Sequence, residues 1–189
     1  CGGRGWRGWQ CDRRWWSEAA ADQLVSKMAE AMKTLKIGPC HDSSNDFGPV
    51  ITKQHQQKVF GYIDSAQEQG ACVVVDGRNP DVAGYEDGFY VGGTLIDHVT
   101  SQMESYNAEI FGPVLQVVRV DSMQEAMDLI DAHEYGNGTA IFTRDGDAAR
   151  EFANNVNVGM VGVNVPIPVP VAYHSFGGWK ASMFGDHSI

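Results

Sequence analysis

Paired or clustered cysteines are missing from this chain. Its four cysteines stand alone at positions 1, 11, 40 and 72, and none forms a Cys-x-x-Cys pair or a Cys/His cluster with the spacing of a metal site. We therefore expect no bound metal. Scattered free thiols favour a reducing compartment, which predicts a cytoplasmic protein, or a protein of the mitochondrial matrix if the organism is a eukaryote.

Long apolar runs and an excess of positive charge are also missing. No stretch of eighteen consecutive apolar residues occurs, and the N-terminus has no apolar signal segment, so we expect neither a membrane span nor a signal peptide. Lysine and arginine number 14 against 24 aspartate and glutamate residues, which gives a net charge of -10. This acidic balance argues against nucleic acids and anionic membranes as partners.

The chain does contain the periodicities of helices and strands. Apolar residues recur at helical spacing over residues 18–35, and Thr52 is a good N-cap for a second helix. Ser122 and Glu125 fit a capping box for a third helix, and Asp145 can cap a fourth. Short β-branched or apolar runs predict strands at residues 72–75, 89–96, 114–120, 139–143 and 160–165.

The last three predicted strands alternate with the last two predicted helices. The crossovers are long enough for parallel pairing, and the strands are almost continuously apolar, as in sheets that are covered on both faces. We therefore predict an α/β fold with a mostly parallel sheet and flanking helices, in which residues 114–120, 139–143 and 160–165 pair in parallel. The sequence has no glycine-rich strand–loop–helix with the spacing of a dinucleotide site.

Three short motifs occur in a fixed order in the second half of the chain. They are Glu-Ile-Phe-Gly-Pro-Val at residues 109–114, Gly-Val-Asn-Val-Pro at 162–166 and Ser-Phe-Gly-Gly-Trp-Lys at 175–180. Together they resemble the catalytic half of an aldehyde dehydrogenase, and the resemblance covers residues 18–186. Three further stretches, at residues 46–52, 135–139 and 166–170, are similar to the branch that oxidises methylmalonate semialdehyde and releases an acyl-CoA.

The resemblance implies roles for particular residues. Glu109 would accept hydrogen bonds from the nicotinamide ribose of NAD, and Phe111 would lie beside the nicotinamide ring. Asn164, Pro166 and Phe176 would contribute to the substrate pocket. Each residue also has a simpler interpretation: Glu109 as a surface acid, Phe111 as ordinary core and Asn164 as a turn residue. We treat Lys180 and His174 as structural residues and assign no role to the other histidines.

The implied reaction needs a thiolate, which attacks the aldehyde before a hydride leaves and a thioester remains. In the family this cysteine follows a Gly-Gln-x-type turn and precedes an apolar strand. Residues 9–11, Trp-Gln-Cys, are the nearest match, so Cys11 is the candidate nucleophile and Cys1 a weaker one. Residues 12–16 do not read as a buried strand, however, and spacing from the first helix places the family's cysteine nearer to Trp6.

Residues 1–17 form an atypical N-terminal segment that is rich in Gly, Arg, Trp and Cys. These residues have G-rich codons, so one hypothesis is that a reading-frame slip replaced the true catalytic strand. The alternative is a genuine, divergent or tag-like N-terminus, and comparing the three reading frames of the coding DNA decides between them. We interpret residues 18–189 as an aldehyde dehydrogenase-like catalytic domain that is C-terminally truncated, because the family's last strand and oligomerisation arm should follow Gly185.

The resemblance therefore implies an NAD-dependent aldehyde dehydrogenase that is a homo-oligomer at full length. The expected substrate is a small semialdehyde of the methylmalonate or malonate type, as in valine catabolism, and coenzyme A is the expected co-substrate. This chain alone is expected to be incomplete as an enzyme. Two alternatives stay open: a catalytically inactive fragment or interaction module of the same fold, and an aldehyde dehydrogenase that does not use coenzyme A.

Overall fold

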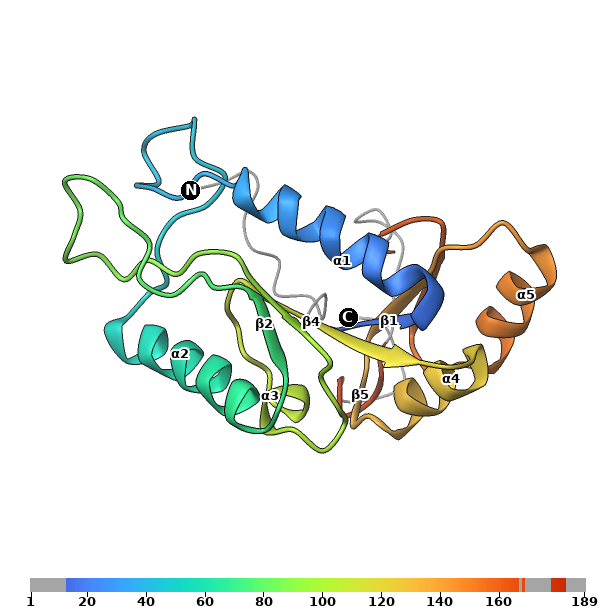
Figure 1. Ribbon diagram of the computed structural model, residues 1–189. Coiled ribbons are helices and arrows are strands. Elements are labelled where there is room, and N and C mark those ends of the chain that lie inside the picture. The colour runs from blue at the N-terminus through green and yellow to red at the C-terminus, as the bar shows by residue number, and fades with distance from the viewer. Residues whose placement is uncertain (1–12, 167, 169–177, 183–189) are drawn as a thin grey trace. The chain divides into compact units, whose positions relative to one another are not determined.

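The computed structural model of the chain describes residues 13–166, 168 and 178–182, with the backbone alone for residues 13–20 (Figure 1). The chain divides into two compact units, residues 1–119 and residues 120–189, which we call unit 1 and unit 2. Each unit has its own sheet structure. None of the described helices is long and apolar enough to cross a membrane.

Unit 1 is built around a four-stranded sheet. The strands lie in the order β1 (Arg13–Ser17), β4 (Val114–Val120), β3 (Thr94–Asp97) and β2 (Cys72–Val75). Strands β3 and β4 pair in parallel, with Leu95 opposite Leu115, whereas β2 pairs with β3 in antiparallel fashion. The parallel pair therefore lies in the middle of the sheet, and the antiparallel pairing lies toward one edge.

Helix α1 (Glu18–Lys33) covers one face of this sheet. Its residues Val25 and Ala29 pack in one buried cluster with Leu95 of β3 and Val117 of β4. Side chains alternate between the two faces of a strand, so residues 95 and 117 both point toward α1. Figure 1 shows α1 lying along the strands on this side.

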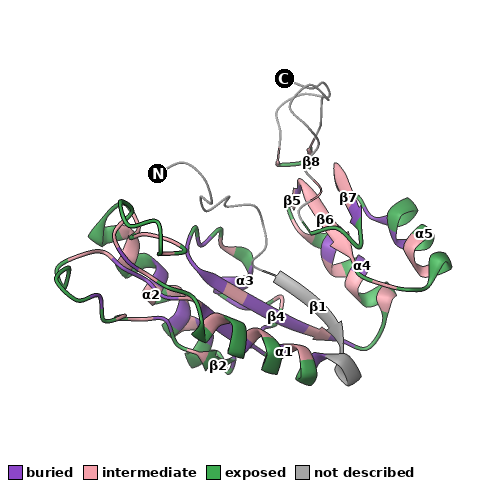
Figure 2. Ribbon diagram, turned by 90° about the horizontal axis from the view of Figure 1, so that it is seen from above, coloured by how far each residue is buried: buried purple, intermediate pink, exposed green. Residues whose placement is uncertain are grey.

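Helices α2 (Lys53–Glu68) and α3 (Glu104–Asn107) lie against the other face. The Gln116 side chain of β4, which is fully buried, donates a hydrogen bond from Nε2 to the Ser105 carbonyl of α3 at 2.9 Å. All four residues of β3 are buried, as expected for a strand with both faces covered. Figure 2 shows that burial is concentrated in β4 and in the inward side of the helices.

Unit 2 contains helices α4 (Met123–Ala132) and α5 (Gly146–Asn155) and two short two-stranded sheets. Strands β6 (Gly138–Ile141) and β7 (Met160–Val163) pair in parallel. Strands β5 (Tyr135–Gly136) and β8 (Trp179–Lys180) pair in antiparallel fashion. Lys180 also donates hydrogen bonds from Nζ to the carbonyls of Ile130 and Asp131, so this cation caps the last turn of α4.

The helix starts agree with the caps predicted from the sequence. Thr52 accepts a hydrogen bond from the backbone N–H of His55 at the start of α2, and Ser122 accepts one from Glu125 at the start of α4. The Glu125 carboxylate reaches back to the N–H of residue 121, one position earlier than in a standard capping box. Asp145 caps α5 as expected.

Two predictions about strands were wrong. Residues 89–93 do not extend β3, because Gly92 donates to the Gly77 carbonyl at 2.6 Å and a Cβ on Gly77 would collide with the Gly92 carbonyl. The absence of side chains at these two glycines therefore allows the backbone after β2 to approach the backbone before β3 closely. Residues 12–16 were not expected to form a buried strand, and β1 begins at Arg13 at the edge of the sheet, beside β4.

The second wrong prediction concerns strand pairing. We expected residues 114–120 to pair with the strands of the chain's last third, but β4 lies between β1 and β3 in unit 1. Strands β6 and β7 pair with each other as predicted, in a separate sheet. Sequence periodicity located the strands, but it carried no information on which strands of similar composition become neighbours.

Candidate functional site

The connection between α3 and β4 carries the acid and the aromatic ring that the first motif singled out. Ile110 has no exposed surface, and Gly112 and Pro113 are buried as well. Glu109 and Phe111, in contrast, are exposed, and 59% of Phe111 is accessible to solvent. The connection is therefore anchored in the core between the carboxylate and the phenyl ring and again directly after the ring, while both of these groups face solvent.

Phe111 has a left-handed backbone conformation, with φ at 53°. A bulky residue rarely adopts this region, and such a conformation costs about 1–3 kcal/mol, which the surrounding structure must offset. The next residue, Gly112, lies directly against α2, where an added Cβ would be 2.8 Å from Cγ2 of Val59. A side chain at position 112 would push the connection away from α2, so the glycine is required for this close approach.

The first turn of α2 contacts the connection between α3 and β4. His55, in the first turn of α2, places Nε2 2.8 Å from the carbonyl oxygen of Phe111. His55 also lines an open depression, together with Thr52, Gln54, Gln57 and Lys58. Because His55 both lines the depression and contacts the Phe111 carbonyl, the depression lies next to the backbone of Phe111. Polar side chains and one cation, Lys58, line it.

The far end of α2 holds the helix that precedes the connection. Ser65 donates a hydrogen bond to the carboxylate of Glu104, the first residue of α3, at 3.3 Å. The backbone N–H of Glu104 donates to the side-chain oxygen of Gln69, also at 3.3 Å. Helix α2 thus fixes both α3 and the turn at Phe111, so the acid and the ring are carried on a segment that is held at two points.

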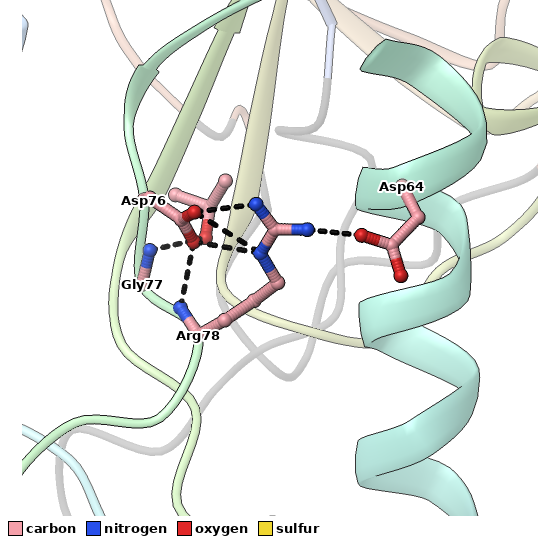
Figure 3. A network of polar contacts seen from close by, with 5 residues as sticks. Asp64, Asp76, Gly77 and Arg78 are labelled. Atoms are coloured by element: carbon pink, nitrogen blue, oxygen red, sulfur yellow. Dashed lines mark hydrogen bonds and ion pairs between the residues drawn. The ribbon is translucent and has the colours of Figure 1, made fainter. Parts of the chain in front are cut away.

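A polar network ties α2 to the end of β2 (Figure 3). The Arg78 guanidinium lies between Asp76 and Asp64 of α2 and makes ion pairs with both. Hydrogen bonds from Arg78 lower the pKa of Asp76 below its ordinary value of 3.8. The N–H of Gly77 donates to the hydroxyl of Thr94 in β3 at 3.1 Å. This network fixes α2 relative to the sheet, and therefore also fixes the residues that contact Phe111.

A second arginine connects the sheet to α1. Arg119 of β4 binds Asp97 of β3 with two hydrogen bonds, of 2.7 and 3.1 Å, and makes an ion pair of 2.7 Å with Asp22 of α1. Burial alone would raise the pKa of Asp97, but the hydrogen bonds from Arg119 and from the N–H of His98 outweigh burial and lower it below 3.8. Both arginines serve the scaffold rather than the exposed acid and ring.

Asn164 and Pro166, two of the residues predicted for the substrate pocket, belong to unit 2, whereas Glu109 and Phe111 belong to unit 1. Asn164 follows β7 with a left-handed φ of 55° and is exposed, as is Pro166. The Asn164 side chain accepts from the N–H of Thr143 and donates to its carbonyl, both at 2.9 Å. Its amide therefore joins the segments that follow β6 and β7, which is the turn role we named as the simpler interpretation.

Several predicted residues cannot be placed in this geometry. Cys11, Cys1, His174 and Phe176 lie outside the residues that the structure describes. Within the described part of the chain, no group of three or more histidine, cysteine, aspartate or glutamate side chains could hold a metal ion. The sequence analysis also missed His55, whose contact with Phe111 joins residues 56 positions apart and leaves no local pattern in the sequence.

The exposed carboxylate and ring have the chemistry that the sugar and base end of a nicotinamide cofactor requires. A carboxylate accepts hydrogen bonds from a ribose diol well, and an exposed phenyl ring offers a flat apolar surface. The sequence profile of the aldehyde dehydrogenase family matches residues 2–189. This chain belongs to the aldehyde dehydrogenase family. The resemblance read from the motifs is thereby confirmed, as is the α/β fold.

Relatives within this aldehyde dehydrogenase family carry closely related names. The malonate-semialdehyde dehydrogenase of Pseudomonas aeruginosa is 61% identical over 169 residues, which cover 89% of this chain and 34% of the relative. The crystal structure of methylmalonate-semialdehyde dehydrogenase from Oceanimonas doudoroffii has a TM-score of 0.90 and 69% identity, over 94% of this chain and 37% of that one. A Sinorhizobium meliloti relative, solved in complex with NAD, has a TM-score of 0.90 and 55% identity, over 93% of this chain and 36% of that one. The aldehyde dehydrogenase chain described here thus spans about a third of the length of these relatives.

Proposed function

We propose that this chain supplies the nicotinamide-facing part of an NAD-dependent semialdehyde dehydrogenase that converts malonate or methylmalonate semialdehyde into an acyl-CoA. The observation that carries the proposal is the anchored connection between α3 and β4, in which Glu109 and Phe111 are exposed on either side of the buried Ile110. An exposed carboxylate close to an exposed phenyl ring on one anchored segment offers the hydrogen-bond acceptor and the flat apolar surface that a nicotinamide riboside would use, which supports the proposal.

The substrate class is supported by the names of the similar proteins. The chain is 61% identical to a malonate-semialdehyde dehydrogenase and 69% identical to a methylmalonate-semialdehyde dehydrogenase, over about a third of the length of each. The two substrates differ by one methyl group, and a hydrophobic pocket discriminates against one methylene by only about 1–3 kcal/mol. We therefore propose a short semialdehyde with a carboxylate as substrate, and the assay below tests both malonate semialdehyde and methylmalonate semialdehyde.

The cofactor proposal rests on Glu109 and Phe111 and on the NAD complex of the Sinorhizobium relative. When bound, the nicotinamide supplies the hydride acceptor for aldehyde oxidation. Glu109 would hold the ribose through hydrogen bonds to its carboxylate, and Phe111 would pack against the nicotinamide end and exclude water there. Orientation of this kind accelerates a transfer between two bound groups because the reacting atoms are already aligned.

Coenzyme A as co-substrate, a cysteine nucleophile ahead of α1, the homo-oligomeric state and a cytoplasmic or matrix location belong to the same proposal. Cys11 is the candidate for that cysteine in this chain, although its spacing from the first helix differs from the spacing expected in the family. A thioester intermediate is released as an acyl-CoA when a second thiol attacks it, so a cysteine nucleophile and coenzyme A are chemically consistent. The reading-frame hypothesis for residues 1–17 bears directly on Cys11, because the family's nucleophile is expected in this segment.

Two chimeras of the Pseudomonas relative test the proposal. In the first, residues 18–189 replace the matching segment of the relative, which keeps its own preceding sequence; in the second, residues 1–189 do so. We expect the first chimera to form NADH from malonate or methylmalonate semialdehyde only when coenzyme A is present, measured by absorbance and by mass spectrometry of the acyl-CoA. The second chimera is expected to be inactive, because Cys11 lacks the expected spacing from the first helix.

The outcomes separate the alternatives. NADH and a free acid without coenzyme A would favour a non-acylating aldehyde dehydrogenase. A folded first chimera that oxidises neither semialdehyde would contradict the proposal and favour an inactive module. Activity of the second chimera that disappears in its Cys11→Ala variant would restore Cys11 as the nucleophile and remove the reading-frame hypothesis.

A further inference from the structure

His55 is the residue of α2 that contacts the backbone of the predicted cofactor-binding segment. Its Nε2 lies 2.8 Å from the Phe111 carbonyl oxygen, and its own N–H is held by the N-cap hydroxyl of Thr52 at 3.1 Å. The helix cap therefore fixes the backbone from which the imidazole extends. The carbonyl it contacts belongs to the peptide that follows the left-handed residue Phe111.

We propose that His55 is a positioning residue for the cofactor site: its imidazole holds the Phe111 carbonyl and so keeps the left-handed turn that presents Phe111 and Glu109 to NAD. This inference deepens the proposed function and depends on it for its catalytic meaning, but the hydrogen bond itself can be tested without any activity.

The chemistry of the contact fixes which ring nitrogen carries the proton. A carbonyl oxygen only accepts hydrogen bonds, so Nε2 must be the donor. In the neutral imidazole this assigns the hydrogen to Nε2 and leaves Nδ1 as an acceptor. The neutral Nε2–H tautomer is therefore a direct signature of the proposed contact in solution.

The surrounding contacts explain why loss of the His55 side chain would change the position of the Phe111 segment without unfolding the chain. Gly112 packs against Val59, and Glu104 is bound by Gln69, and neither contact involves His55. Loss of the imidazole leaves these anchors in place. It releases only the peptide between them, at the residue that has a left-handed backbone conformation. A variant without the donor is expected to keep the fold while the acid and ring lose their fixed direction.

The tautomer is measured on the 189-residue chain with histidine labelled in ¹⁵N, using long-range ¹H–¹⁵N correlation at a pH where His55 is neutral. The signal is assigned by its loss in His55→Gln, and the Phe111 carbonyl carbon is observed in the same samples. We expect the Nε2–H tautomer and a shift of the Phe111 carbonyl resonance in His55→Leu that is largely reversed in His55→Gln. An Nδ1–H tautomer, or no change at Phe111, would overturn the inference.

Kinetics are measured on the chimera that carries residues 18–189. His55→Leu removes the donor, and His55→Gln keeps an N–H near the position of Nε2. We expect the KM for NAD to rise about fivefold in His55→Leu, the typical effect of one neutral hydrogen bond, with the KM for the aldehyde and the melting temperature nearly unchanged. His55→Gln should recover most of the loss.

His41→Leu makes the same replacement in an exposed loop and serves as the matched control, for which wild-type kinetics are expected. Equal KM values for NAD in wild type and His55→Leu would overturn the positioning role, as would a His55→Gln variant no better than His55→Leu. If the unsubstituted chimera is inactive, the proposed function fails, and the tautomer measurement alone decides whether His55 holds Phe111.

Discussion

At position 111 the chain places a large aromatic residue in a left-handed backbone conformation and leaves more than half of it exposed. Either property alone is uncommon for phenylalanine. Their combination, next to the exposed acid Glu109 and between buried neighbours, distinguishes this connection from an ordinary surface loop. At the residue scale, the candidate site therefore consists of one charge and one ring that the fold holds toward solvent.

Replacing Glu109 by alanine tests the charge. In the chimera that carries residues 18–189, Glu109→Ala should lower kcat/KM for NAD by roughly tenfold to a hundredfold, because one charged hydrogen-bond partner contributes about 1.5–3 kcal/mol. Steady-state NADH formation at varied NAD measures the effect. Glu68→Ala, at an exposed acid of α2, is the matched control and should leave kcat/KM unchanged. Unaltered kinetics of Glu109→Ala would remove this residue from the cofactor site.

Among the elements, α2 and β4 organise the site. Helix α2 contacts the sheet through the Arg78 network, holds α3 through Ser65 and Gln69, and reaches Phe111 through His55. Strand β4 begins directly after the motif and is buried along most of its length. The exposed segment therefore leads into a strand in the interior of the sheet, which limits how far it can move.

The ion network of β4 gives an element-scale prediction. Arg119→Ala leaves Asp97, whose side chain is 5% exposed, without its partner and should lower the free energy of unfolding by about 3 kcal/mol. Asp22→Ala removes the partner that is 81% exposed and should cost less than about 1 kcal/mol. Urea denaturation followed by circular dichroism compares the two variants.

The effect of Arg119→Ala also has a defined pH dependence. The pKa of Asp97 is lowered in the folded chain, so the stabilisation is fully present above its unfolded value near 3.8 and is lost as the pH falls through the folded value. The difference between wild type and Arg119→Ala should therefore shrink in acid. Equal losses of stability in Arg119→Ala and Asp22→Ala near neutral pH would show that the buried pair is not the stabilising one.

Helices were easier to predict from the sequence than strand partners. Thr52, Ser122 and Asp145 each cap the helix that was expected to follow, because a cap and its helical periodicity lie within a few residues of each other. The neighbours of β4 depend on contacts between segments that are distant in the sequence, and the periodicity of a single segment does not predict such contacts. The same reason separates Glu109 and Phe111, which a local motif indicated, from His55, whose contact spans 56 positions.

At the scale of the whole molecule, the proposed function gives unit 1 one end of a cofactor site. Glu109 and Phe111 would bind a ribose and a nicotinamide there, but the sequence contains no glycine-rich strand–loop–helix that would bind the pyrophosphate of a dinucleotide. The chain spans about a third of the length of its relatives, and the rest of such a site is expected in sequence that the relatives have in addition.

The isolated 189-residue chain should therefore show no measurable affinity for NAD. Contacts to one ribose and one ring do not offset the loss of translational and rotational freedom on binding, which is estimated at about 4–15 kcal/mol. Isothermal titration calorimetry measures the affinity, and the chimera with residues 18–189 serves as the positive control. Saturable micromolar binding by the isolated chain would mean that its residues form a more complete cofactor site than Glu109 and Phe111 alone.

The left-handed turn at Phe111 also bears on how selection has acted on this chain. Glycine or asparagine would adopt the same φ at a lower conformational cost, and neither would leave an apolar ring in water. A lineage selected for stability alone would drift toward those residues, since such substitutions are easily reached and commonly stabilise a fold. Folding therefore disfavours phenylalanine at position 111, and under the proposed function stability and activity would place opposite demands on this position.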